Sequence, residues 1–220
     1  MQQRRIFILA LVVTAAIVTG AYAKGWNPSR VLTLLSNQER GFSSSDLLVD
    51  SSRTPRAPEL AKGDWINSEP LTLKGLQGHV VVVDFWTFGC YNCRNTLPSL
   101  KSWDSKYRDK GLTIIGVHTP EFDTEKKLEN LRGEVASLGL HYPVVTDNDY
   151  ATWTAYRVEA WPTLFVLDKS GRIRWQHVGE GAYAETEAVI QKLLAEEPTP
   201  PVEKNFEGGR LQHQPLTRIA

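Results

Sequence analysis

The pattern of apolar and polar positions predicts a central block of alternating strands and helices with polar segments on both sides. Two continuous apolar runs, 80–86 and 112–118, have the length and β-branched composition of strands buried on both faces. The segment 94–110 between them has apolar residues at helical spacing, and Gly111 follows where a helix commonly ends. The apolar positions of this predicted helix are Leu97, Leu100, Trp103 and Tyr107.

The second half of the block continues the alternation. An amphipathic helix is predicted over 124–140, capped by Asp123 or Thr124. Its apolar face comprises Leu128, Leu131, Val135 and Leu138. The remaining predicted elements are a short strand over 142–147, a short helix over 149–158, a hairpin over 163–178 that turns at 169–171, and a closing helix over 184–197. This order predicts an α/β fold with a central mixed sheet, mainly parallel, flanked by helices, with an antiparallel edge from the hairpin.

The beginning of the chain has the features of an export signal. Arg4 and Arg5 precede an apolar run that ends in the small-residue pattern Ala21-Tyr22-Ala23. Residues 1–23 are therefore interpreted as a signal peptide cleaved after Ala23, or as an uncleaved N-terminal membrane anchor that spans with residues 6–23. Both interpretations place the remainder in the periplasm or another extracytoplasmic space, because flanking basic residues stay in the cytoplasm.

Composition separates a domain from its flanks. Residues 24–57 are polar and rich in Ser, Arg and Pro, which predicts a linker, and residues 198–220 lack periodicity, which predicts a flexible tail. The folded domain is expected over 58–197. The chain carries 25 basic and 25 acidic residues, interspersed along its length. This balance leaves no basic stripe for a nucleic acid partner.

The chain has two cysteines, Cys90 and Cys93, placed where a buried strand passes into a helix. Cysteines three apart at a helix start are close enough to bridge. Cys90 lies at the helix N-terminus, where free N–H groups favour a thiolate, and Cys93 lies one turn inside. We expect Cys90 to attack a disulfide and Cys93 to resolve the mixed disulfide, with Tyr91 and Asn92 between them tuning the reduction potential.

Two other uses of the pair are weaker. A purely structural disulfide across so short a loop would restrain the unfolded chain little. Two cysteines do not complete a zinc site, and Arg94 stands where covalent haem attachment needs a histidine. No metal and no cofactor is therefore expected.

Three further features point to the same chemistry. Asp84 interrupts an apolar strand six residues before Cys90, and a buried carboxyl there would exchange a proton with a thiol, unless it lies at a wet strand end. Pro98 falls within the helical pattern and would kink it. Pro162 follows Trp161 before a strand; a cis bond there would leave the Trp161 backbone free to pair with a substrate, although trans is the commoner state. Trp86 and Trp161 are candidate walls of the site.

These motifs resemble the thioredoxin superfamily over residues 58–197. The resemblance rests on DFWTFGCYNC, the proline after it and WPTLFVLDKSGRI. It implies functional roles for Asp84, Cys90, Cys93, Pro98 and Pro162. The extra helix and strand between Cys93 and Pro162 resemble the membrane-tethered TlpA/ResA branch. NTLPSLKSW and GVHTPEF look closer still to the thioredoxin-like domain of DipZ-type proteins.

The resemblance implies protein thiol and disulfide substrates and a separate membrane electron-transfer protein as donor. A reductase of protein disulfides, serving cytochrome c maturation or misoxidised proteins, is preferred to an oxidase. The Tyr-Asn pair replaces the Gly-Pro of thioredoxin, and Thr96 stands where ResA-like proteins often have a Glu. The reduction potential of thioredoxin and the substrate of ResA-like proteins therefore do not transfer to this chain. Glu121, after a strand end, is interpreted as a solvated loop carboxylate in preference to a residue near the site.

Two rival functions use the same residues. A thiol peroxidase is indicated by Thr87 three positions before Cys90, but Val83 stands where that pattern has a proline. A copper-binding chaperone would add His118 or His177 to the two thiolates.

Overall fold

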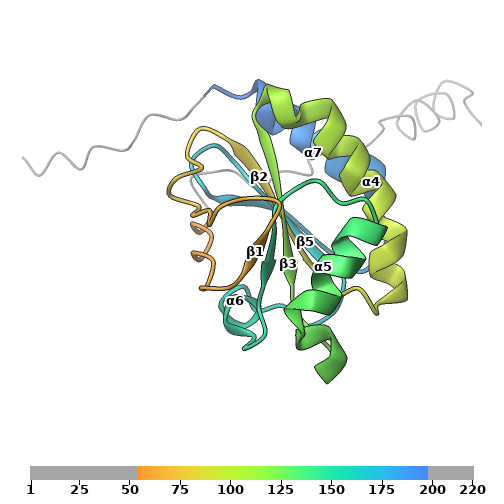
Figure 1. Ribbon diagram of the computed structural model, residues 1–220. Helices are drawn as coiled ribbons and strands as arrows, with labels where there is room; N and C mark the ends of the chain where they lie inside the picture. The colour runs from red at the N-terminus through yellow and green to blue at the C-terminus, as the bar shows by residue number, and fades with distance from the viewer. Residues whose placement is uncertain (1–53, 198–220) are drawn as a thin grey trace, which may run out of the picture. The chain divides into compact units, whose positions relative to one another are not determined.

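The computed structural model describes residues 54–197, which form one six-stranded sheet with helices on both faces (Figure 1). The predicted signal or anchor, residues 24–53 of the predicted linker and the predicted tail 198–220 lie outside the described residues. Among residues 54–197, no helix is long and apolar enough to span a bilayer.

The sheet has the strand order β1-β4-β3-β2-β5-β6. The strands are β1 (Trp65–Ile66), β2 (Val80–Trp86), β3 (Leu112–His118), β4 (Val144–Thr146), β5 (Thr163–Leu167) and β6 (Ile173–Val178). Strands β2, β3 and β4 run parallel, whereas β1, β5 and β6 join the sheet by antiparallel pairing. The expectation of a mainly parallel sheet is therefore wrong, because β5 pairs antiparallel with the central strand β2; the mixed sheet and the hairpin are confirmed.

Helices cover both faces of the sheet (Figure 1). Helices α4 (Tyr91–Tyr107), α5 (Leu128–Ser137) and α7 (Tyr183–Ala195) lie on one side, and the short α6 (Ala151–Ala155) lies on the other. Two 3₁₀ turns, η2 (Arg108–Lys110) and η3 (Asp123–Lys126), complete the elements of the described part. Gly111, with φ of 94°, ends the helical segment after α4, as its position predicts.

The central strand β2 is buried on both faces, as its apolar run predicts. Val81, Val83 and Phe85 join the apolar cluster beneath α6. Because side chains alternate along a strand, Asp84 and Trp86 face the opposite layer, that of α4, α5 and α7. The single carboxyl of β2 is thus enclosed under three helices.

Helix α5 begins later than its sequence predicts. The expected caps Asp123 and Thr124 both lie in η3. The residue before α5 is Lys127, whose side chain makes no capping hydrogen bond. The turn η3 forms before α5 because the Glu125 carboxylate accepts hydrogen bonds from the backbone N–H groups of Glu121 and Phe122. The predicted apolar face of the helix is confirmed at its two central positions, since Leu131 and Val135 are buried.

The folded part extends before the expected boundary at residue 58. Arg56 forms a β-bridge with Arg172, the Ala57 N–H donates to Gly171 (2.9 Å), and the Ile173 N–H donates to Pro55 (3.2 Å). The last residues of the predicted linker therefore lie along the start of β6.

Candidate active site

The two cysteines lie at the junction of β2 and α4. Cys90 immediately precedes α4 and is joined to Cys93 by a disulfide bond, with the two Cα atoms 5.3 Å apart. Cys90 is half-buried, whereas Cys93 is 1% exposed. Of the two cysteines, Cys90 is therefore the more open to solvent.

The start of α4 supplies a hydrogen bond to this sulfur. The Cys93 N–H donates to Cys90 Sγ across 3.2 Å, one of the N–H groups that a helix start leaves without an intrahelical partner. The same donor and the positive end of the helix dipole are placed to stabilise a thiolate at Cys90. Cys90 therefore lies at the helix N-terminus, and Cys93 lies in the first turn behind it.

A three-residue loop, 87–89, carries the chain from β2 to Cys90. The Cys90 N–H donates to the Thr87 carbonyl (3.2 Å), and the Thr87 hydroxyl hydrogen-bonds His118 Nε2 (3.2 Å). Phe88 stacks on the His118 ring with a centroid distance of 5.4 Å and an interplanar angle of 16°. His118 at the end of β3 therefore contacts the loop at both Thr87 and Phe88.

Two charged side chains hold the rest of the loop. Arg94 on α4 donates from Nε to the Phe88 carbonyl (2.9 Å) and pairs with Glu134 on α5 (2.8 Å). The Gly89 N–H donates to the buried carboxylate of Glu125 (3.0 Å). The backbone before Cys90 is thus fixed from two sides.

Asp84 is the buried carboxyl that the sequence predicts. It is 1% exposed, so it does not lie at a wet strand end, and its Oδ1 has no hydrogen-bond partner among the described residues. Burial raises the pKa of Asp84 to about 7. The carboxyl can therefore change protonation near neutral pH.

His118 is enclosed at the same end of the sheet. Burial lowers its pKa to about 4, with the charge of Glu125 opposing the shift in part. The imidazole is therefore neutral at pH 7. Its Nδ1 has no partner among the described residues, and Nε2 is engaged by Thr87.

Trp161 and Pro162 lie at the end of the sheet where β2 ends and β5 begins. Thr163 is the antiparallel partner of Phe85, so Pro162 stands beside the start of the cysteine loop. The Trp161–Pro162 peptide bond is cis, the rarer of the two states that the sequence left open. Trp161 donates from Nε1 to the Thr119 carbonyl (3.1 Å), and its backbone forms no hydrogen bond within residues 54–197. The Trp161 backbone is therefore available to an extended chain.

The other residues that the sequence suggests for the site differ in solvent exposure. Tyr91 is 76% exposed, and Asn92 is also exposed, so both flank Cys90 at the surface. Trp86 differs from the expectation, because it is fully buried beside Gly116 and has no surface for a substrate. The side chain of Glu121 is exposed, as expected for a loop carboxylate.

Sequence reasoning missed Glu125, which is buried against the cysteine loop. A signal was present, since a Glu three residues after a loop residue often accepts that residue's N–H at a helix start. For His118 the sequence suggests only a copper-ligand role. Within residues 54–197, no three His, Cys, Asp or Glu side chains form a group that could hold a metal ion.

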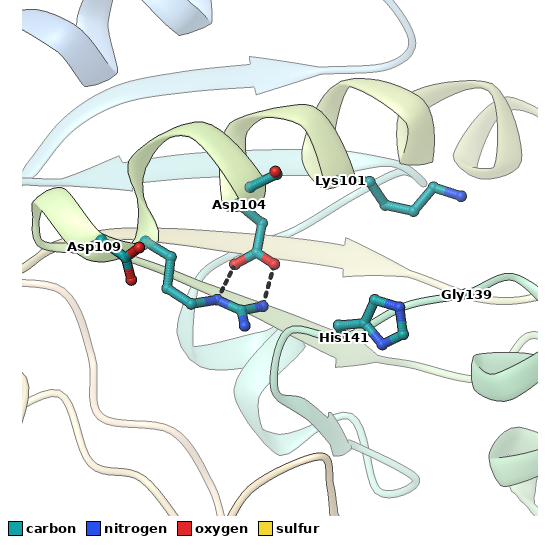
Figure 2. Close-up of a pocket in the computed structure, with 7 residues that line it drawn as sticks. Lys101, Asp104, Asp109, Gly139 and His141 are labelled. Atoms are coloured by element: carbon teal, nitrogen blue, oxygen red, sulfur yellow. Dashed lines mark hydrogen bonds and ion pairs between the residues drawn. The ribbon is translucent and has the colours of Figure 1, made fainter.

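A pocket of about 360 Å³ lies away from the cysteines, on the second half of α4 (Figure 2). It is lined by Lys101, Asp104, Ser105, Arg108, Asp109, Gly139 and His141. Arg108 and Asp104 form a two-pronged ion pair in it, as the dashed lines in Figure 2 mark. Lys101 follows Cys93 by about 12 Å of helix rise, so this pocket is separate from the candidate site.

Comparison with known proteins agrees with this geometry. The family model described as AhpC/TSA family matches residues 55–176. The protein DipZ of Mycobacterium tuberculosis is 44% identical over 143 residues, which cover 63% of this chain and 20% of that protein. This chain therefore spans about a fifth of that relative's length. The thiol-disulfide oxidoreductase ResA of Bacillus thuringiensis is 30% identical over 137 residues, which cover 62% of this chain and 76% of ResA.

A solved structure shows the same fold. The thiol-disulfide isomerase from Corynebacterium glutamicum superposes with a TM-score of 0.58 at 27% identity, covering 64% of this chain and 98% of that one.

Proposed function

Since this chain belongs to the AhpC/TSA family of thioredoxin-like proteins and resembles thiol-disulfide oxidoreductases within it, we propose that it is an extracytoplasmic reductase of protein disulfides. The observation that carries the proposal is the unequal exposure of the two sulfurs, with Cys90 half-buried at the start of α4 and Cys93 enclosed behind it. An ordered dithiol of this kind exchanges disulfides in two steps.

In the first step the Cys90 thiolate attacks one sulfur of a substrate disulfide. A bond forms between Cys90 Sγ and that sulfur, and the other substrate sulfur leaves as a thiolate. The Trp161 backbone and the exposed Tyr91 are proposed to hold the substrate chain beside the reacting sulfurs, with Pro162 and Asn92 completing this contact surface.

In the second step the Cys93 thiolate attacks Cys90 Sγ. This attack forms the Cys90–Cys93 disulfide, breaks the bond between Cys90 and the substrate, and releases the second substrate sulfur as a thiolate, which takes a proton from water. The substrate thus gains the two electrons that the pair loses. Asp84 is proposed to accept the Cys93 proton, a role that suits a carboxyl whose pKa burial raises to about 7.

Each cycle leaves the pair oxidised, so a donor must return two electrons. We propose a separate membrane electron-transfer protein, and an extracytoplasmic location set by residues 1–23. Misoxidised proteins and the cytochrome c maturation pathway are the proposed users, and residues 58–197 are the proposed catalytic domain.

The test is insulin reduction by the full chain with dithiothreitol as reductant. Cys90→Ala is expected to abolish turnover, and Cys93→Ala to trap mixed disulfides with the substrate. Full activity of Cys90→Ala would refute the mechanism. The direction is tested by equilibrium with glutathione: a potential near −120 mV, that of the strongest thiol oxidants, would make the protein an oxidase.

A peroxidase is tested in the same preparation by peroxide consumption with dithiothreitol. Thr87, the residue that suggests this activity, is buried and its hydroxyl hydrogen-bonds His118. We therefore expect slow, non-catalytic peroxide consumption.

A further inference from the structure

Glu125 is a buried carboxylate that the proposed reaction does not use. It is 3% exposed, and no cationic side chain among the described residues forms an ion pair with it. Carboxylates are rarely buried without a partner, because the charge loses its hydration. Its position therefore requires a compensating set of contacts.

Three backbone N–H groups provide that compensation. Glu125 Oε1 accepts from Gly89 (3.0 Å), and Oε2 accepts from Glu121 (2.6 Å) and Phe122 (3.0 Å). Both oxygens act as acceptors, which is the role of an ionised carboxylate. The side chain thus joins the loop after β3 to the loop that carries Cys90.

Gly89 leaves the space for this contact. A Cβ atom at residue 89 would lie 2.3 Å from Glu125 Oε1, which is closer than any real contact allows. The absence of a side chain at this position therefore lets the carboxylate approach the peptide that directly precedes Cys90.

We propose that Glu125 is a positioning residue that fixes the loop before Cys90 and holds a negative charge beside it, so that the Cys90 thiolate is disfavoured and the pair is a stronger reductant. A like charge in a buried setting destabilises an anion more than a solvated one does. The inference rests on the proposed function, in which Cys90 is the attacking thiolate.

The other charged groups around the loop do not replace this effect. Arg94 on α4 is half exposed and shares its charge with Glu134. His118 on β3 is neutral above about pH 4, and Glu180 is exposed and hydrogen-bonded to Asn95. Asp84 on β2 is a second carboxyl facing this layer, and its pKa of about 7 means that it adds negative charge only above neutral pH.

The consequence appears in the redox equilibrium. Two glutathione thiols give two electrons and two protons to the Cys90–Cys93 disulfide, which yields the dithiol and one glutathione disulfide. A charge that destabilises the Cys90 thiolate acts on the reduced form alone. It acts only where that thiolate is populated, so its effect must vanish at a pH well below the thiol pKa.

The experiment compares Glu125→Gln with Glu121→Gln in the full chain. Both remove one carboxylate from the segment between β3 and α5, but the Glu121 side chain is exposed whereas that of Glu125 is buried. The Cys90 acid dissociation is followed by thiolate absorbance, and the glutathione equilibrium is measured at pH 5.5 and pH 8. Neither measurement needs a protein substrate, so both remain valid if insulin reduction fails.

For Glu125→Gln we expect the Cys90 acid dissociation constant to rise about fivefold. The glutathione equilibrium at pH 8 should shift about fivefold toward the dithiol, or about 20 mV, with little shift at pH 5.5. Glu121→Gln should match the wild type within twofold. Equal behaviour of the two variants, or a shift of Glu125→Gln that is the same at both pH values, would overturn the proposal.

Gly89→Ala provides a second route if Glu125→Gln does not fold. Its Cβ pushes the intact carboxylate away from the peptide before Cys90. The Cys90 acid dissociation constant should rise in the same direction by a smaller factor. An unchanged constant in Gly89→Ala would also refute the inference.

Discussion

Asp84 on β2 is the register partner of Gly116 on β3, and the bare Gly116 backbone leaves the space that the Trp86 indole and Tyr142 ring occupy on that face. A Cβ atom at residue 116 would lie 2.8 Å from Trp86 Nε1 and 3.3 Å from Tyr142 Cε2. The buried carboxyl, the indole and the phenol therefore share one enclosed layer. None of Asp84 Oδ1, Trp86 Nε1 and the Tyr142 hydroxyl has a partner among the described residues.

Asp84→Asn should change how stability depends on pH. The folded pKa of Asp84 is raised to about 7 from 3.8, so the folded state holds a proton that the unfolded state releases between these values. Stability from this group is complete below about pH 4 and is lost as pH rises to about 7. Relative to the wild type, the free energy of unfolding of Asp84→Asn should therefore rise by about 4 kcal/mol between pH 4 and pH 8, as measured by urea unfolding. A constant difference across this range would contradict the prediction.

Replacement of His118 should show the opposite dependence. Its folded pKa is lowered to about 4 from 6.5, so the unfolded state binds the extra proton between these values. Stability from this group is complete above about pH 6.5 and is lost as pH falls to about 4. Relative to the wild type, the free energy of unfolding of His118→Gln should therefore rise by about 3 kcal/mol as the pH falls from 7.5 to 4. Parallel unfolding curves for the two proteins would exclude this assignment.

Gly116→Ala should destabilise the fold by overpacking. The added methyl group meets Trp86 and Tyr142 inside a closed layer, which costs about 1–3 kcal/mol. Gly133→Ala is the matched control, since Gly133 lies within α5 and an added Cβ there has nothing within 4 Å. The control should gain up to about 1 kcal/mol from helix propensity. Thermal unfolding of both variants distinguishes packing from backbone effects.

Tyr91→Ala should weaken substrate binding without affecting stability. Tyr91 is 76% exposed beside Cys90, so removing its ring costs little in the folded state. We expect KM for insulin to rise about threefold to tenfold, the effect of losing about 1 kcal/mol of contact. Gln77→Ala changes an exposed side chain that precedes β2, at the end of that strand remote from Cys90, and should leave KM unchanged. An equal rise in both variants would mean that Tyr91 has no special role.

The sequence predicted the elements that local pattern determines. Strands β2 and β3 have the predicted bounds, since each is a continuous apolar run ended by polar or turn residues. The placement of Cys90 at the start of α4 also followed from position alone. In contrast, the antiparallel pairing of β5 with β2 depends on the direction in which the chain enters from Pro162, which no local pattern records.

Long-range contacts explain the remaining differences. β1 has only two residues and exists because it pairs with β4, about eighty positions away in the chain. Glu125 has the sequence appearance of a solvated helix-start residue, and only folding brings Gly89 to its carboxylate. Likewise, the sequence suggests Trp86 as part of the substrate surface, but in the folded protein its ring is buried against Gly116 and contributes to packing.

Both edge strands of the described sheet leave little backbone free to pair with a strand of another copy. On one side β1 offers only Trp65 and Ile66, and the chain then turns at Asn67, whose φ is 66°. On the other side Pro55 and Arg56 lie along the start of β6, so part of its backbone is already occupied by a charged, proline-containing segment. Short borders, charge and proline are the means by which proteins resist edge-to-edge aggregation. Pro55 and Arg56 therefore shorten the stretch of edge backbone with which another copy could pair.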